Sequence, residues 1–340
     1  MTSALESLRR AWAGQGGVLR RSLARRATRA ALATVALLVL VAGAADFLAS
    51  DLPIALSLHG RVHVLPNVIR PVALRAYDNR RLLRVLAPDD WMIAPLVAWG
   101  ANGHDLDAVL EAPSRRHWLG TDSGGRDVFA RIVHGARVSL TVGVLSVAIL
   151  SCIGLAVGVT AGYCRGWVDA CLMRVVDALY AVPTLLLLIT LLSVLRPSGY
   201  GAVLAMLATI GLVRWTDLAR LVRAESLRVC ATPYVEAARA LGLSSVSVVV
   251  RHVLPNVVSP VLVAASFAMA ASITMEGALS FLGFGVPDDV ASWGGLLRDA
   301  RDHVDAWWLA VFPGAVLFVS VSVYNVVGEA LRDAFDPTLD

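Results

Sequence analysis

The amino-acid sequence predicts an all-α protein that crosses a membrane several times. Of its 340 residues, 57% are hydrophobic and only 16% are charged, and the mean hydropathy is +0.68. Soluble domains rarely have such a composition. In addition, six apolar stretches each have roughly the 20 residues that a helix needs to cross the hydrocarbon core. We therefore expect six transmembrane helices.

The predicted membrane spans lie at residues 30–48, 138–163, 172–195, 202–221, 255–281 and 307–327. The first span has an alternative interpretation, because a basic leader, a short apolar core and the small residues of "AGAAD" are also typical of a cleaved signal peptide. Cleavage would leave five crossings and would place the two termini on opposite sides of the membrane, which favours the interpretation as a span.

The arginines predict the orientation in the membrane. All 30 basic residues are arginine, and there is no lysine. The arginines gather in three regions: before the first span, around the turn after the second span, and after the fourth span. These three regions lie on one side of the membrane if all six spans are real. The positive-inside rule makes that side the cytoplasm. Both termini are then cytoplasmic, and this clustering at span ends favours membrane orientation over nucleic-acid binding.

Three glycines in the second span share one helix face. Gly154, Gly158 and Gly162 are four residues apart, so they allow another helix to approach closely. The alternative is that a membrane helix merely tolerates them. We expect the packing role.

A polar stretch, "EAARALGLSSVSVVVRHVLPN" (236–256), separates the fourth and fifth spans. Thr232 and Pro233 are typical of a helix start, and Gly242 is where a helix ends with positive φ. A second short helix should start at Ser244 or Ser245 and run to Arg251, before Leu254 and Pro255 end it. Ala237 and Ala238, beside Glu236, should form a low surface on which a partner docks; a plain amphipathic linker is the alternative.

The order of Glu236-Ala237-Ala238, Gly242 and Leu254-Pro255 resembles the EAA loop of bacterial ABC importer permeases. Four further stretches resemble the oligopeptide, dipeptide and nickel branch, at residues 117–140, 162–188, 280–301 and 328–337. His252 lies two residues before Leu254-Pro255, where the EAA loop of this family usually has an apolar residue. The segment "LGTD..GRD" is similar to that of the second of two paired permeases, and the long outer segment resembles the subgroup for larger peptides and microcin C.

The resemblance implies a type I ABC importer permease fold with six transmembrane helices. It implies the following division of the chain: 1–29 cytoplasmic, 30–48 the first helix, 49–136 an extended extracytoplasmic segment, 137–329 the transmembrane domain with its coupling loop at 232–254, and 330–340 a cytoplasmic tail. We expect the outer segment to be ordered, because it has no low-complexity tract.

The implied function is import of peptides across the bacterial cytoplasmic membrane. The implied partners are a second permease subunit in a heterodimer, two ATPase subunits or domains and an extracytoplasmic binding protein. The chain itself would be no enzyme and would bind no cofactor, since ATP and Mg²⁺ would lie on the ATPases. In the coupling loop, the implied contact residues are Glu236, Ala237, Ala238, Gly242, Leu254 and Pro255.

Other functions remain open as alternatives. One alternative is the same importer architecture with nickel or another small solute as the substrate. An ion-coupled secondary transporter would show an internal repeat and broken helices, and we find no repeat. An intramembrane enzyme would need a Ser/Lys, Asp/Asp or His-Glu-x-x-His site, and the sequence has neither lysine nor that His motif.

The glycine-rich "GTDSGG" (120–125) suggests a phosphate loop, but such a loop requires a lysine that this chain lacks. The resemblance makes it a structured segment at the outer mouth, with candidate residues Gly120, Thr121, Asp122, Gly125, Arg126 and Asp127. The four histidines of the outer segment (59, 63, 104 and 117) and the four cysteines lack the spacing of a metal site, and we expect no metal and no disulfide framework.

Three carboxylates fall inside predicted spans and are candidates for the translocation path, because charges in a membrane are costly. Asp177 has Arg174 three residues away, and Asp217 has Arg214 and Arg220 at that spacing, so both can form local ion pairs. Glu276 has no such neighbour. We expect Glu276 near the outer mouth, about 30 Å along the fifth span, with a role in gating or substrate passage.

Overall fold

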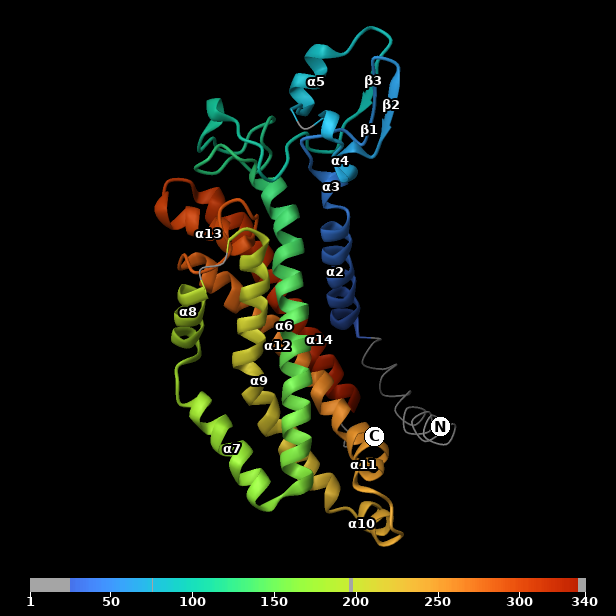
Figure 1. The fold of residues 1–340 in the computed structure, drawn as a ribbon. Helices are drawn as coiled ribbons and strands as arrows, with labels where there is room; N and C mark the ends of the chain where they lie inside the picture. Colours follow the sequence, from blue (N-terminus) through green and yellow to red (C-terminus); the bar gives the residue numbers. More distant parts are fainter. Residues whose placement is uncertain (1–24, 75, 196–197, 336–340) are drawn as a thin grey trace.

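A bundle of long helices carries a small mixed α/β unit at one end (Figure 1). The computed structural model describes residues 25–74, 76–195 and 198–335. Within these ranges, five helices are long and apolar enough to cross a membrane: α2 (Arg26–Gly43), α6 (Val128–Cys164), α9 (Tyr200–Cys230), the continuous helix Ser245–Phe281 and α14 (Trp307–Phe335).

The predicted third span is not one straight helix. It falls on α7 (Gly166–Tyr180) and α8 (Thr184–Leu195), which meet at an angle of 82°. The break contains Pro183, which has no N–H to donate and which disfavours helical geometry at Val182. The described part of the chain thus has up to six candidate spans if the bent pair counts as one.

Helices α6 and α9 pack along the three-glycine face predicted from the sequence. A Cβ atom added to Gly154 would lie 2.9 Å from Cβ of Leu218, and one added to Gly158 would lie 2.6 Å from Cβ of Val222. At Gly162 the added atom would lie 2.8 Å from a backbone oxygen of α9. These distances leave no room for a side chain, so the packing role is confirmed.

The prediction of an all-α chain is wrong for the segment between α2 and α6. Three short antiparallel strands, β1 (Ala55–Leu58), β2 (Arg61–Val64) and β3 (Trp91–Ile93), form a sheet in the order β2-β1-β3. The turn between β1 and β2 uses two residues with positive φ, His59 and Gly60, as a tight hairpin requires.

The rest of that unit is short helical turns: α3 (Ala45–Leu48), α4 (Pro66–Ile69), η1 (Val72–Leu74), α5 (Asn79–Val85) and η2 (Leu106–Ala108). A small apolar core of Leu52, Leu56, Leu74 and Leu82 holds it together. The described part of this segment is therefore folded, in line with the prediction of an ordered segment.

At the end of the bundle nearest the sheet, α13 (Trp293–Asp302) closes over α6 and α12 (Leu254–Phe281) (Figure 1). Trp293 is fully buried and donates from Nε1 to the carbonyl oxygen of Ile132 at 3.0 Å. A Cβ atom at Gly294 would lie 2.8 Å from Cα of Gly277, so glycine is required for this close contact.

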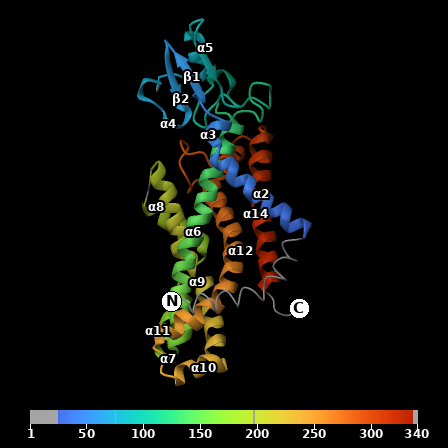
Figure 2. The same ribbon diagram turned by 90° about the vertical axis from the view of Figure 1, so that its right-hand side faces the viewer.

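The opposite end of the bundle carries α10 (Pro233–Ala240) and α11 (Ser245–Val248) (Figure 1). On this side, an ion pair between Arg25 and Asp333 joins the start of α2 to the last turn of α14. Figure 2 shows α2 crossing α14 obliquely on the outside of the bundle.

Candidate functional site

The turn between α10 and α11 has the geometry that Gly242 predicts. Gly242 has φ +76°, its N–H donates to the Arg239 carbonyl at 3.0 Å, and the N–H of Leu243 donates to the Ala238 carbonyl at 3.3 Å. This pair of hydrogen bonds is the Schellman ending of a helix. The Ser244 side chain then accepts from the N–H of Ser247 at 3.3 Å and caps α11.

The two alanines of α10 face opposite environments. Ala237 and Glu236 are exposed, whereas Ala238 is only 5% exposed and packs in the main core of the bundle. The expectation that both alanines form a docking surface is therefore wrong for Ala238. Successive helix positions differ by about 100°, so adjacent alanines do not share a face.

Exposed apolar side chains occur on the same short helices and turn as Ala237. They come from α10, the turn, α11 and η3: Tyr234, Leu241, Val246 and Val250. Leu241 is 81% exposed and Val246 is 73% exposed. A cluster of exposed apolar side chains on and beside a polar helix is typical of a protein-binding surface.

The expected break at Leu254 and Pro255 does not occur. A π-helical turn, η3 (Val249–Val253), joins α11 directly to α12, and the helix continues through both residues. The proline lacks the N–H of a regular helix, and the wider turn lies immediately before it. The segments α11, η3 and α12 therefore form one continuous helix, Ser245–Phe281.

A cavity of about 720 Å³ opens on the bundle where α7 bends into α8. Its walls come from α7, the bend, α8, α9, α12 and α14, and its polar side chains include Asp217, Arg214, Thr274 and Asn325. Asp217, with a side chain that is 57% exposed, thus lines an open cavity on the helical bundle. Its nearest arginine is Arg214, with Nη2 of Arg214 4.0 Å from Oδ2 of Asp217.

Asp177 pairs across helices and does not line this cavity. Its Oδ1 accepts from Nη2 of Arg220 in α9 at 2.7 Å, so the expected local pair with Arg174 is wrong. A second pair, between Asp169 and Arg223 at 2.5 and 2.6 Å, also joins α7 to α9. Both pairs hold α7 beside α9, and the second pair joins residues too far apart in the sequence for a helical spacing to predict it.

Glu276 is fully buried and already has partners. It accepts from Oγ of Ser139 in α6 at 2.8 Å and from Oγ of Ser280 at 2.9 Å, and it is not among the residues that line the cavity. The expectation that Glu276 is unpaired is therefore wrong, whereas its role in the translocation path stays a prediction. The sequence does not predict its hydroxyl partners, because a serine in an apolar span is also typical of helix packing.

The residues of "GTDSGGRD" form a rigid turn that starts α6. Asp122 accepts from the N–H groups of Gly124 and Arg126 at 2.9 Å each and from Nε of Arg126 at 2.7 Å. Gly120 and Gly125 have positive φ. The Thr121 carbonyl accepts from Nε1 of Trp308 at 3.0 Å. The segment is structured, as expected, and its polar groups bond to one another and to neighbouring segments, as Nη1 of Arg126 does to the Asp288 carbonyl at 2.8 Å.

His117 lies buried between two carboxylates at this turn. Its Nδ1 is 2.8 Å from Oδ2 of Asp127, and its Nε2 is 3.3 Å from Oδ2 of Asp105. Burial opposes protonation, but the bonds to Asp127 and Asp105 outweigh it, so the pKa of His117 is raised. For Asp105, burial acts to raise the pKa, but hydrogen bonds from Arg80 and His117 lower it overall.

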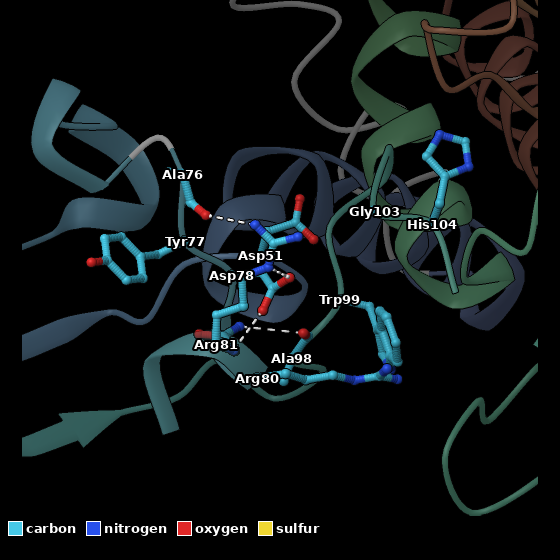
Figure 3. A pocket seen from close by; sticks show the side chains of 11 residues that line it. Asp51, Ala76, Tyr77, Asp78, Arg80, Arg81, Ala98, Trp99, Gly103 and His104 are labelled. Atoms are coloured by element: carbon cyan, nitrogen blue, oxygen red, sulfur yellow. Dashed lines mark hydrogen bonds and ion pairs between the residues drawn. The ribbon is translucent and has the colours of Figure 1, made fainter. Parts of the chain in front are cut away.

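A second, smaller cavity of about 250 Å³ lies in the mixed unit, bordered by Asp51, Arg80, Trp99 and His104 (Figure 3). The guanidinium of Arg80 lies 3.8 Å from the ring centre of Trp99 and pairs with Asp105 at 2.8 Å. Asp51 accepts from the N–H of Gly100 at 2.7 Å. These groups are engaged in holding the unit together.

Comparison with known proteins identifies the class. Residues 154–340 match the family of binding-protein-dependent transport system inner membrane components. A protein of Brucella abortus, named as a peptide transport system permease, is 40% identical over 81% of this chain and 93% of its own length. The glutathione transport system permease GsiD of Pectobacterium atrosepticum is 40% identical over 70% of this chain and 78% of its own.

In fold, the chain is similar to a subunit of the MetNI methionine ABC transporter in an inward-facing conformation, with a TM-score of 0.52 and 18% identity over 61% of this chain and 97% of that one. The chain belongs to the family of binding-protein-dependent transport system inner membrane components. It is thus an ABC importer permease, and the resemblance inferred from its EAA loop is confirmed.

Proposed function

We propose that this chain is one membrane-spanning subunit of an ABC importer that carries peptides into the cell. The relatives named for peptide and glutathione transport support the substrate class. The observation that carries the proposal is the cavity of about 720 Å³ among the membrane helices. Its size lies within the roughly 300–1,000 Å³ of small-ligand sites.

The coupling of transport to ATP would use the surface around Ala237. Its exposed apolar side chains suit an ATPase subunit that binds ATP and Mg²⁺, whereas this chain has no phosphate-binding lysine. The helix that begins in α11 continues without a break into α12, and α12 lines the cavity. Movement of the ATPase would therefore tilt a wall of the cavity.

In this proposal, α7 and α8 together make one bent span, so the chain crosses the membrane six times. The ion pair between Arg25 and Asp333 supports a common side for the start of α2 and the end of α14, and the arginine clusters support the cytoplasm as that side. The mixed unit then lies outside the cytoplasmic membrane. It would face the binding protein and a second, paired permease subunit.

A direct test isolates this chain from gently solubilised membranes and identifies its companions by mass spectrometry. The proposal expects two ATPase subunits or domains and a second permease, with a peptide recovered from the binding protein. Recovery of the chain alone, with ion-driven and ATP-independent uptake, would contradict it. Recovery of nickel or another small solute from the binding protein would show that this solute, and not a peptide, is the substrate.

A further inference from the structure

An arginine in the middle of a membrane helix borders the large cavity, with one carboxylate 4.0 Å away and no closer ion pair among the described residues. Arg214 lies near the centre of α9, about 21 Å from Tyr200 at a helical rise of about 1.5 Å per residue. Its side chain is 20% exposed and lines the cavity. An arginine at this depth is expensive, and such residues mark sites of function.

The hydrogen-bonding capacity of this guanidinium is largely unused. Nη1 is buried without a hydrogen-bond partner among the described residues. Nη2 is 4.0 Å from Oδ2 of Asp217, which is beyond hydrogen-bond distance. A guanidinium presents donors in a planar fork that matches a carboxylate. The position of Arg214 therefore suits an incoming carboxylate.

Asp217 differs from the carboxylates that serve only to join helices. Its side chain is 57% exposed and lines the same cavity. By contrast, Asp169 and Asp177 make hydrogen bonds of 2.7 Å or less to arginines of α9. Asp217 balances the charge of Arg214 at a distance, without occupying the donors of the guanidinium.

The rest of the cavity wall suits the backbone of a short peptide. Thr274 and Asn325 add hydrogen-bonding groups, while Ala270 and Ala271 leave space beside them. Phe267 and Tyr180 provide apolar surface. Such a mixture of a mainly apolar wall with a few polar groups is typical of sites that hold small ligands.

We propose that Arg214 binds a carboxylate of the substrate in the translocation cavity, with Asp217 as its counter-ion when the cavity is empty. The proposal rests on the proposed function, since it takes the substrate to be a peptide. The carboxylate is either the C-terminal group or an acidic side chain. Arg214 thereby makes this membrane subunit selective, in addition to the binding protein.

The test compares uptake of three labelled probes into proteoliposomes that contain the complete importer and its binding protein. The probes are tri-alanine, tri-alanine amide and alanyl-glutamyl-alanine amide. Uptake by each variant is divided by uptake of the same probe by the unaltered complex. The selectivity of the binding protein cancels in that ratio, so the ratio reports the membrane subunit alone.

For Arg214→Gln we expect a loss of about tenfold or more with a probe that carries the recognised carboxylate, as for the loss of a charge-assisted hydrogen bond. A loss confined to tri-alanine assigns the C-terminal group. A loss confined to the glutamyl probe assigns the side chain, and a loss with both but not with tri-alanine amide supports recognition of either. Equal ratios for all three probes would overturn the proposal.

Three further variants guard against a folding defect. Arg228→Gln removes an exposed arginine of the same helix and should leave all three ratios near one. Arg214→Lys keeps the charge without the fork and should lie between Arg214→Gln and the unaltered complex. Asp217→Asn removes the counter-ion, and the KM of the carboxylate probe should fall by about twofold or more, because a competing carboxylate is gone.

An unchanged or higher KM in Asp217→Asn would contradict the proposal even if Arg214→Gln does not assemble. A failure of the unaltered complex to take up any of the three peptides has a different meaning. It would contradict peptide transport itself, and the inference about Arg214 with it.

Discussion

The Nδ1 atom of His117 lies 2.8 Å from Oδ2 of Asp127, while Oδ1 of Asp127 accepts a hydrogen bond from the N–H of Ala130 at 2.8 Å. One carboxylate thus caps α6, a helix of 37 residues, and holds a buried imidazole from the preceding loop. On its other side His117 meets Asp105, which also pairs with Arg80. The mixed unit and α6 are therefore joined through a titratable group.

This joint should make stability depend on pH. The pKa of His117 is raised in the folded protein above the ordinary value of 6.5. Its contribution is then fully present below about pH 6.5 and is lost as the pH rises through the raised pKa. The melting temperature of the complex should be lower at about pH 9 than at about pH 6. In His117→Gln this part of the pH dependence should disappear; an identical pH profile in the variant would contradict the prediction.

The contact between α6 and α9 should tolerate no side chain at Gly158. Gly158→Ala forces a methyl group against Val222 and the Ala219 carbonyl, which lies 2.7 Å from the added atom. We expect a destabilisation of about 1–3 kcal/mol, as for overpacked cores, seen as a lower melting temperature of the purified complex. Gly201→Ala is the matched control in α9, because nothing lies within 4 Å of its added Cβ atom. Equal melting temperatures of the two variants would contradict this packing.

The neighbouring alanines of α10 should respond differently to the same change. Ala237→Trp adds bulk to an exposed position and should reduce ATPase recovery in co-purification while this chain keeps its amount in the membrane. Ala238→Trp enlarges a side chain in the core and should reduce the amount of folded chain itself, through overpacking. If Ala237→Trp retains the ATPase and normal uptake, the surface around it is not the docking site.

Gly242 should matter for its backbone conformation alone. No atom lies within 4 Å of an added Cβ atom there, but φ is +76°. Gly242→Val should therefore cost roughly 1 kcal/mol or more in the left-handed conformation and uncouple ATP hydrolysis from uptake. Gly242→Asn, which tolerates this conformation better, is the control. Measurement of peptide taken up per ATP hydrolysed distinguishes them, and equal coupling in all three proteins would oppose the prediction.

Glu276 should affect stability more than transport. Glu276→Ala leaves two buried serine hydroxyls without their acceptor, and we expect a loss of about 1–3 kcal/mol in stability. Uptake per folded complex should change little, because the side chain does not line the cavity. Thermal unfolding and uptake normalised to the amount of complex test this together. Normal stability with strongly reduced uptake would return Glu276 to the translocation path.

The sequence predicted the features that depend on local pattern. The apolar stretches located the spans, the four-residue spacing of Gly154, Gly158 and Gly162 located the packing face, and Gly242 located the turn between α10 and α11. Each of these depends on a few adjacent residues and on hydrophobic length. Such features can be predicted from local sequence, without knowing which distant residues pack against it.

The predictions from the sequence were wrong for contacts between residues on separate helices. Asp177 meets Arg220 and Glu276 meets Ser139 only because α7, α9, α6 and α12 pack together, which spacing along one helix does not reveal. Ala238 faces inward because of how α10 lies on the bundle. The strands of the mixed unit have only three or four residues each, too few to show a reliable alternation.

The central claim is that ATP hydrolysis by partner chains drives peptide import through this chain. The most direct measurement is uptake of labelled tri-alanine by proteoliposomes that contain the complete complex and its binding protein, with either ATP and Mg²⁺ or a non-hydrolysable ATP analogue supplied to the ATPase side. We predict accumulation with ATP and none with the analogue. Equal accumulation with the analogue, abolished by collapse of an ion gradient, would contradict the claim.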